Sequence, residues 1–302
     1  MPLNAFTFFL CALLSAGSIV SCPAQDDAPE KSKTSGKPPA PGKGNERPAN
    51  GGVPEDLLDD EHVQEEFGVS DYTTPSIKKI FEDLESLGNL PYDSLKRTIP
   101  KTTSSDRTLV ALNLGVLIGD GFLSVQSEKI SDIEDIGRAI LKHGKVLGAG
   151  AKVAERTKSI LENSALSDWK QLKQDLSGTQ REVKHEMVLL RDIDMVHLIS
   201  LGGWLRGLEI GSAASLEPFS ADKAKVLARH DLTEYFLYVL DSLNERVQRL
   251  PHIQALKTGL SEIERIVNLP EGKPFSKEEV IKLQKTAAGL LAIISPVEKT
   301  DK

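Results

Sequence analysis

Apolar residues recur every three or four positions from residue 54 onward, which is the period of an amphipathic helix. No stretch alternates between apolar and polar residues for long enough to predict a strand. Leu, Ala, Lys and Glu are abundant and aromatic residues make up only 5% of the chain, a composition typical of helical proteins. We therefore predict an all-α fold, a multi-helix bundle of about eight or nine helices spanning residues 54–302.

Helix start and stop signals divide this region. Ser131 and Ser276 each precede a Glu by three positions, which predicts two capping boxes. Ser167 and Ser220 occupy N-cap positions before apolar-periodic runs, and Thr74-Pro75 combines an N-cap with a first-turn proline. With Gly and Pro as stops, the expected helices are 55–67, 75–88, 105–127, 132–147, 150–164, 168–214 (with a break allowed near Gly178), 221–249, 252–268 and 277–295.

Two of these segments, 109–123 and 198–212, are strongly apolar and carry small residues about four positions apart. A glycine inside a helix costs up to about 1 kcal/mol, so several of them suggest a compensating gain. Residues four apart share one face, and small ones let two helix backbones approach closely. We predict tight helix packing at the centre of the bundle, with the two segments as candidate partners; glycine tolerated on an open face is the alternative. The small residues are Gly115, Gly119, Ser200, Gly203, Gly207 and Gly211.

The same two segments hint at an internal duplication that would give two weakly related halves. Leu114-Gly115 is followed by Ser131, and Leu201-Gly202 by Ser220, at similar spacing. Each of the following helices then reaches a pair made of a basic residue and a histidine, Lys142-His143 and Arg229-His230. The shared residues are few.

Polar residues recur every seven positions along the first apolar segment, so they lie on one stripe. One interpretation is a solvated stripe on a buried helix. The other is a polar cluster lining an inter-helix cavity, in which Asp120 meets Arg206 or Arg138, because a buried carboxylate needs a cation or hydrogen-bond donors. The stripe consists of Asp106, Asn113, Asp120 and Ser127. The candidate ligand-binding residues are Asn113, Asp120, Arg206 and Glu209.

Motifs for catalysis or metal binding are missing from the sequence. There is no His-Glu-x-x-His, no Gly-x-Ser-x-Gly and no phosphate-binding loop. A single Glu-x-x-His, Glu182 to His185, does not make a di-iron site. Asp194 and His197 fall on the same expected helix, where twelve residues rotate His197 about 120° away from His185. We expect no catalytic residue, no metal ligand and no cofactor.

The N-terminus carries an export signal. An apolar stretch of about a dozen residues, 5–16, is too short to span a bilayer and long enough for a signal peptide. Ile19–Cys22 then resembles a relaxed bacterial lipobox, although no Lys or Arg precedes the apolar stretch. We predict a signal peptide over residues 1–22 and lipidation of Cys22. Plain secretion, with cleavage after Ala24, and an uncleaved anchor are the alternatives.

Residues 23–53 contain Pro, Lys, Gly, Ser, Asp and Asn, and almost no aliphatic or aromatic residue. Such a segment buries too little apolar surface to offset its ordering entropy, so we predict a disordered linker ahead of the helical domain, 54–302. The only cysteines are Cys11 and Cys22, so the predicted mature domain has no disulfide.

The formal net charge of −7 argues against nucleic acid as a partner. The expected function is that of an exported, lipid-anchored protein of a bacterial envelope, acting as a non-enzymatic binding or scaffold module. Its partners would be the membrane, through the N-terminal lipid, and an envelope protein. The alternative is a bundle that binds a small molecule or metal through polar residues of its central helices, and an envelope enzyme with an unrecognised site is third. A filled core favours the binding or scaffold module, and a sizeable inner pocket favours the bundle that binds a small molecule or metal.

Overall fold

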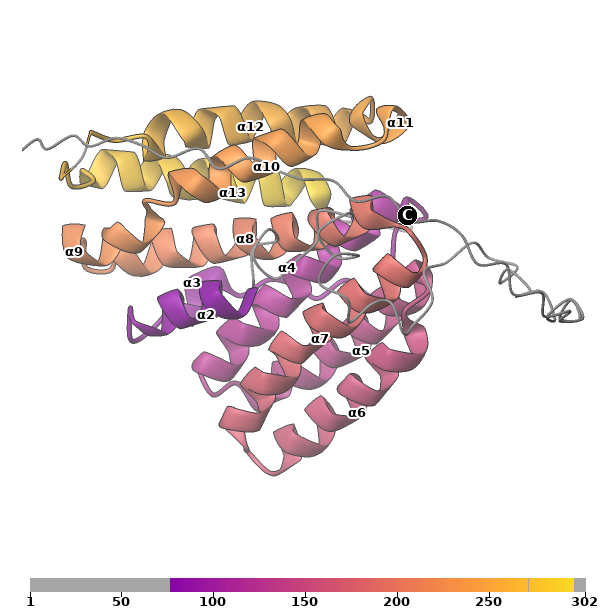
Figure 1. Ribbon diagram of the computed structural model, residues 1–302. Coiled ribbons are helices and arrows are strands. Elements are labelled where there is room, and N and C mark those ends of the chain that lie inside the picture. The colour runs from indigo at the N-terminus through magenta and orange to yellow at the C-terminus, as the bar shows by residue number, and fades with distance from the viewer. Residues whose placement is uncertain (1–76, 271, 296–302) are drawn as a thin grey trace, which may run out of the picture. The chain divides into compact units, whose positions relative to one another are not determined.

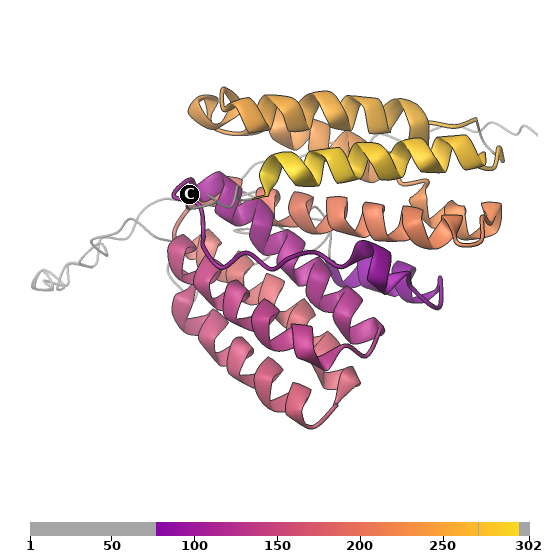
Figure 2. The ribbon, with the colours of Figure 1, turned by 180° about the vertical axis from the view of Figure 1, so that it is seen from behind.

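The computed structural model describes residues 77–270 and 272–295, and the predicted all-α multi-helix bundle is confirmed over these ranges (Figures 1 and 2). No β-strand occurs within them. The predicted signal peptide 1–22 with Cys22, the predicted linker 23–53, the predicted helix 55–67 and the Thr74-Pro75 cap lie outside the described residues.

The first half of the described chain builds one group of four helices that contact each other in a closed order. In that order α4 packs on α5, α5 on α6, α6 on α7, and α7 returns to α4. The helices α2 and α3 precede this group. Their bounds are α2 (Ile77–Glu85), α3 (Tyr92–Leu95), α4 (Arg107–Gln126), α5 (Ile130–Leu147), α6 (Gly150–Ala165) and α7 (Trp169–Leu189).

The second half builds a similar group. In it α10 packs on α12, α12 on α13, and both α10 and α13 contact α8. The short helices α9, η2 and α11 join these longer ones. The bounds are α8 (Ile193–Leu216), α9 (Ala221–Ala224), η2 (Lys225–Leu227), α10 (His230–Ser242), α11 (Glu245–Gln248), α12 (Pro251–Val267) and α13 (Lys277–Ile294).

The helices α4 and α8 form the most extensive helix pair and join the two groups (Figure 1). By length and composition α4 could cross a membrane, but 94% of its apolar window is buried inside the protein, as expected of a core helix. A β-carbon on Gly115 would lie 2.0 Å from the carbonyl oxygen of Ile199, so the two backbones touch there. The prediction that these helices pack tightly against each other is therefore confirmed at Gly115.

The glycines of α8 that are spaced four apart face a different helix from the one we expected. β-Carbons on Gly203 and Gly207 would meet the side chains of Ile77 and Ile80, which belong to α2. A β-carbon on Gly211 would lie 3.2 Å from Leu84 of the same helix. The small residues of α8 therefore let α2 pack closely against α8. This close packing explains how a helix of only nine residues is held in the core.

Two predicted helices are interrupted. The range 168–214 breaks at residues 190–192, where Arg191 has a φ of +55°, and not at Gly178, which lies inside α7. The range 221–249 is divided into α9, η2, α10 and α11. The apolar period continues across residues 190–192, so the sequence does not mark that break.

The predicted helix caps have mixed outcomes. The capping box of Ser276 and Glu279 is present, and the Ser220 side chain accepts from Lys223 N. The box predicted at Ser131 is wrong, because α5 begins at Ile130, one residue ahead of that serine. The cap predicted at Ser167 is also wrong: the neighbouring Asp168 accepts from the backbone of α7.

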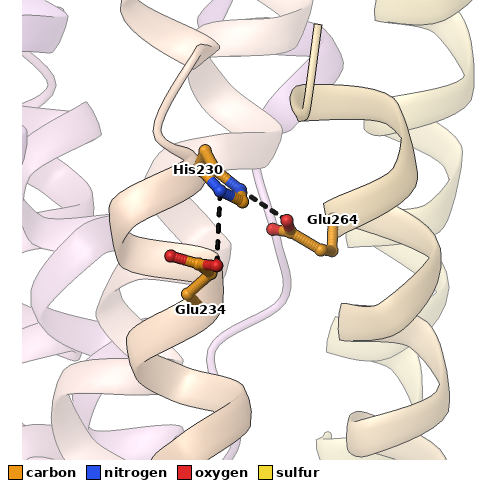
Figure 3. Close-up of side chains that lie close together, drawn as sticks. All are labelled: His230, Glu234 and Glu264. Atoms are coloured by element: carbon orange, nitrogen blue, oxygen red, sulfur yellow. Dashed lines mark ion pairs between the residues drawn. The ribbon is translucent and has the colours of Figure 1, made fainter.

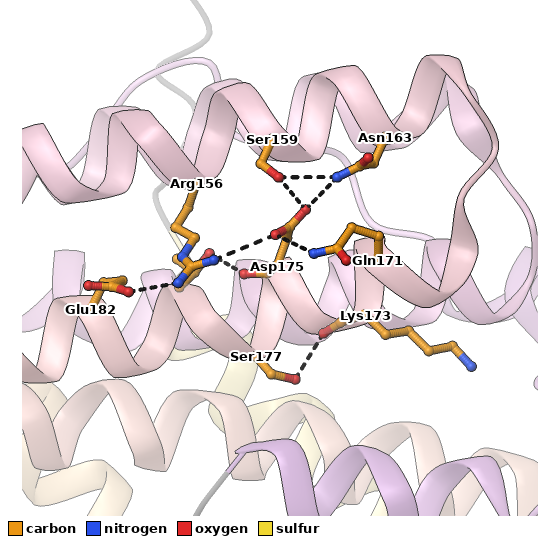
Figure 4. Close-up of polar contacts among 9 residues, drawn as sticks. Arg156, Ser159, Asn163, Gln171, Lys173, Asp175, Ser177 and Glu182 are labelled. Carbon is orange, nitrogen blue, oxygen red and sulfur yellow. Dashed lines mark hydrogen bonds and ion pairs between the residues drawn. The ribbon is translucent and has the colours of Figure 1, made fainter.

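A buried carboxylate ties α6 to α7 (Figure 4). Asp175, which is 1% exposed, accepts hydrogen bonds from Ser159 Oγ at 2.7 Å and Asn163 Nδ2 at 2.8 Å. Arg156 Nη1 lies 3.7 Å from its other oxygen, and Arg156 Nη2 donates to Glu182 at 2.8 Å. Donors on α6 therefore satisfy a charge that would be costly to bury alone.

Candidate functional site

Three of the four predicted ligand-binding residues meet in the core. Arg206 is fully buried, and its Nε donates to Asp120 Oδ1 at 2.7 Å. Its Nη1 donates to Glu209, and its Nη2 donates to the carbonyl oxygen of Leu95 at 2.7 Å. Asp120 is 6% exposed, so the interpretation as a solvated stripe is wrong at this residue, and the predicted contact with Arg206 is present.

Two carboxylates, those of Asp120 and Glu209, share the single guanidinium of Arg206, so the cluster carries one formal negative charge. Burial alone would lower the pKa of Arg206, but the charges and hydrogen bonds of Asp120 and Glu209 outweigh that effect and raise it, so the guanidinium stays charged. The cavity beside Asp120 and Arg206 measures about 10 Å³, roughly the minimum for one water molecule. The geometry is that of a closed structural cluster, and the ligand-binding role of these residues stays a prediction.

Asn113, the fourth predicted residue, lies apart from the other three. Its Nδ2 donates to the carbonyl oxygens of Leu109, at 2.8 Å, and of Ile294, the last residue of α13. The side chain is 3% exposed, so this contact also contradicts the solvated stripe. The next residue of the chain, Ser295, accepts a hydrogen bond from Arg97 Nη2 at 2.6 Å. Asn113 therefore fixes the end of α13 that holds Arg97.

Arg97 belongs to the wall of a groove that the sequence analysis did not predict. The groove has a volume of about 1030 Å³ and lies between residues 93–101 and α5. Part of its lining is apolar, provided by Ile99, Pro100 and Leu141. Its basic lining residues are Lys96, Arg97, Lys101, Arg138, Lys142 and Lys145, and its acidic ones are Asp93, Asp132 and Asp135.

The groove is basic although the protein is acidic. Six cationic residues face three acidic ones, a formal balance of 6 − 3 = +3, whereas the whole chain carries −7. Lys96 pairs with Asp132 at 3.0 Å. The side-chain ammonium of Lys145 has no hydrogen-bond or ion-pair partner within the described ranges, and the Nη1 atom of Arg97 is buried without one. The groove thus offers donors and positive charge to an anionic ligand.

The predicted core residues support this groove from below. Arg206 holds the carbonyl oxygen of Leu95, the residue before Lys96 of the groove wall. Ser295, next to the Asn113 contact, holds Arg97. One sequence signal for the site was present and was missed: Arg138, Lys142 and Lys145 follow each other at i, i+4 and i+7, which places three cations on one face of α5.

The two histidine motifs of the sequence, Glu182 to His185 and Asp194 to His197, lie on different helices. Glu182 and His185 lie on α7, whereas Asp194 and His197 lie on α8, so the expectation that one helix carries both is wrong. His197 Nδ1 lies 2.9 Å from the hydroxyl of Tyr235. Burial, together with the charge of Lys184, lowers the pKa of His197 to about 4. This histidine is therefore neutral at physiological pH.

Another cluster joins His230 and Glu234 of α10 to Glu264 of α12 (Figure 3). One nitrogen or oxygen donor from each of the three lies within 4.8 Å of the others. His230 was weighed in the sequence only as half of a repeated pair with His143. The structure does not support that equivalence, because His143 lies in the last turn of α5 and His230 begins α10.

Comparison with known proteins gives no relative. No family model matches this chain, and no curated protein or solved structure matches it. The fold and the groove define a helical domain with a filled core and a basic surface groove, and the case for function comes from these features.

Proposed function

We propose that this protein is an exported, lipid-anchored and non-enzymatic binding module of a bacterial envelope, and that its helical domain binds an acidic polypeptide segment of a partner protein in the groove along α5. The observation that carries the proposal is the contrast between the core and the groove. The cavities beside the central helices measure about 10 and 30 Å³, whereas the groove measures about 1030 Å³. Space for a ligand therefore lies at the surface.

The dimensions of the groove favour a peptide. From Asp132 to Lys145 its lining follows α5 over thirteen residue steps, which is roughly 20 Å at 1.5 Å per residue. An extended chain advances about 3.3 Å per residue, so about six residues fit this length. Ile99 and Leu141 would contact apolar side chains of the peptide, and Lys142 and Lys145 its carboxylates.

The alternative, a small molecule or metal bound by polar residues of the central helices, has less support. Every guanidinium nitrogen of Arg206 already donates within the protein, to Asp120, Glu209 and Leu95. A ligand would have to displace these bonds, and a buried charge that loses its partner is costly.

Export and lipid anchoring rest on the N-terminal pattern, above all on the apolar stretch 5–16 and Cys22. A lipidated Cys22 would hold the helical domain near a membrane surface. Metabolic labelling with a palmitate analogue tests this in the producing bacterium: the wild type should be labelled and Cys22→Ser should not. A wild type that takes up no label would contradict the anchor while leaving peptide binding open.

Peptide binding is tested with the full chain and a fluorescent hexapeptide of Glu, Asp and Leu, followed by fluorescence anisotropy. The double variant Lys142→Glu/Lys145→Glu should bind at least about tenfold more weakly, because it replaces attraction by repulsion. The matched control Lys152→Glu/Lys170→Glu makes the same change of charge at two exposed sites outside the groove. Equal loss in both double variants would reduce the effect to overall charge and would contradict the groove.

A further inference from the structure

His230 lies between two carboxylates that come from two different helices (Figure 3). It is the first residue of α10, and Glu234 follows one turn later on the same face, with His230 Nε2 3.3 Å from Glu234 Oε1. Glu264, in the last turn of α12, forms an ion pair with His230 Nδ1. The cluster therefore joins the start of α10 to the end of α12.

This donor set has the chemistry of a transition-metal site. A histidine nitrogen with carboxylate oxygens binds zinc and related divalent ions, at about 2.0–2.2 Å from each donor. Two donors on one ion are then up to about 4 Å apart. The donors of His230, Glu234 and Glu264 all lie within 4.8 Å of each other, so small side-chain rotations bring them to one ion.

The charges of the cluster do not balance without a cation. A protonated His230 against Glu234 and Glu264 leaves one negative charge, and a neutral His230 leaves two. Arg229, which precedes His230 in the sequence, is already engaged with Asp231 at 2.8 Å and lies 3.5 Å from Asp83.

One carboxylate oxygen of the cluster lacks a partner. Glu264 Oε2 is buried and accepts no hydrogen bond among the described residues. Burial raises the pKa of Glu264, and His230 only partly offsets this effect. A bound dication would compensate for this burial and supply the missing positive charge.

We propose that His230, Glu234 and Glu264 form a binding site for one divalent transition-metal ion of the zinc class. The side chain of His230 is 40% exposed and that of Glu234 66%, so the remaining coordination positions are open to water. The ion would link α10 to α12. The site is independent of the groove, whose lining contains none of these three residues.

Isothermal titration of the full chain with zinc chloride at neutral pH tests the proposal. The parent for all variants carries Cys11→Ser and Cys22→Ser, because thiolates bind zinc themselves. We expect one zinc ion per chain, with affinity falling at least about tenfold in His230→Gln and in Glu264→Gln. Glu234→Gln, at the most exposed ligand, should lose less. The control His185→Gln changes the same residue type on α7 and should bind as the parent does.

Several outcomes would overturn the site: no zinc binding by the parent up to millimolar concentration, equal affinity in the parent and His230→Gln, or equal loss in His185→Gln. Magnesium binding as tight as zinc binding would also contradict it, because magnesium prefers oxygen ligands. Zinc should raise the melting temperature of the parent and leave that of His230→Gln unchanged. Far-UV circular dichroism tests whether each variant is folded. If His230→Gln is unfolded, the zinc affinity of Glu234→Gln compared with that of the parent tests the site.

Discussion

Gly115 and Gly202 make the same contact in opposite directions across the α4–α8 pair. A β-carbon on Gly115 would lie 2.0 Å from the carbonyl oxygen of Ile199, and one on Gly202 would lie 2.0 Å from that of Leu112. In each helix the contacted carbonyl lies three positions before that helix's own glycine, so the contact has local two-fold symmetry. The Leu-Gly pair that suggested a duplication thus occupies equivalent places in the two helices, while the duplication of the whole halves stays a prediction.

Gly115→Ala and Gly202→Ala should both destabilise the protein. The added methyl group overlaps a backbone carbonyl, and overpacking of this kind costs about 1–3 kcal/mol or more. Alanine's better helix propensity returns up to about 1 kcal/mol of this. Thermal unfolding followed by circular dichroism should show a lower melting temperature for each variant.

Gly289 of α13 is the matched control, because a β-carbon there meets nothing within 4 Å. Gly289→Ala should raise the melting temperature, since only helix propensity changes. A stabilised Gly115→Ala variant would show that the α4–α8 contact is looser than described.

Arg206→Met should cost about 3–5 kcal/mol of unfolding free energy. The substitution keeps much of the side-chain volume but leaves Asp120 and Glu209 without their cation, and unpaired buried charges are strongly destabilising. Urea denaturation measures the loss. Arg138→Ala, which breaks exposed ion pairs with Glu134 and Asp135, should cost less than about 1 kcal/mol. Similar losses in the two variants would contradict the role of Arg206 as the cation that stabilises the buried carboxylates.

Protonation of His197 should make the protein less stable in acid. Its pKa is about 4 in the folded protein and about 6.5 in an unfolded chain. Between these values the unfolded chain binds a proton that the folded one does not, so the unfolding free energy falls as the pH falls through that window. His197→Gln should remove up to about 3 kcal/mol of this pH dependence. Urea denaturation at pH values above and inside the window compares the two proteins, and an unchanged dependence would place the acid sensitivity elsewhere.

Asp175→Ala should destabilise the α6–α7 pair by about 2–4 kcal/mol, because the buried donors of Ser159 and Asn163 lose their acceptor. Glu182→Ala removes a more exposed carboxylate whose ion-pair partner among the described residues is Arg156, and its cost should stay below about 1 kcal/mol. Hydrogen exchange of the α6 amides should accelerate in Asp175→Ala alone. Equal exchange in the two variants would mean that Asp175 does not hold α6 in place.

The fold class and the central pair could be predicted because helical period and small-residue spacing are local signals. The partner of Asp120 could also be predicted from the sequence, because a buried carboxylate in an apolar helix requires a cation or hydrogen-bond donors. The face of Gly207 was not predictable, since helix pairing depends on contacts far apart in sequence: Ile80 of α2, which meets it, precedes it by more than a hundred positions. The break at Arg191 also escaped, because the apolar period continues across it.

The groove and the His230 cluster were missed for related reasons. One wall of the groove, residues 93–101, has no helical period beyond the short α3, so it carries no pattern that the sequence could reveal. His230 and Glu234 share a helical face that was readable. Glu264, however, joins them only because α10 and α12 are neighbours in space.

The groove wall is held from inside the domain at Leu95 and Arg97, through Arg206 and Ser295. An acidic peptide would therefore meet a surface whose backbone is already fixed, and little conformational entropy would be lost on the receptor side. Encounter would be accelerated by the cations and slowed by salt. Differences between peptide sequences would then be expressed as differences in residence time, which makes the dissociation rate the measurement that identifies the natural partner.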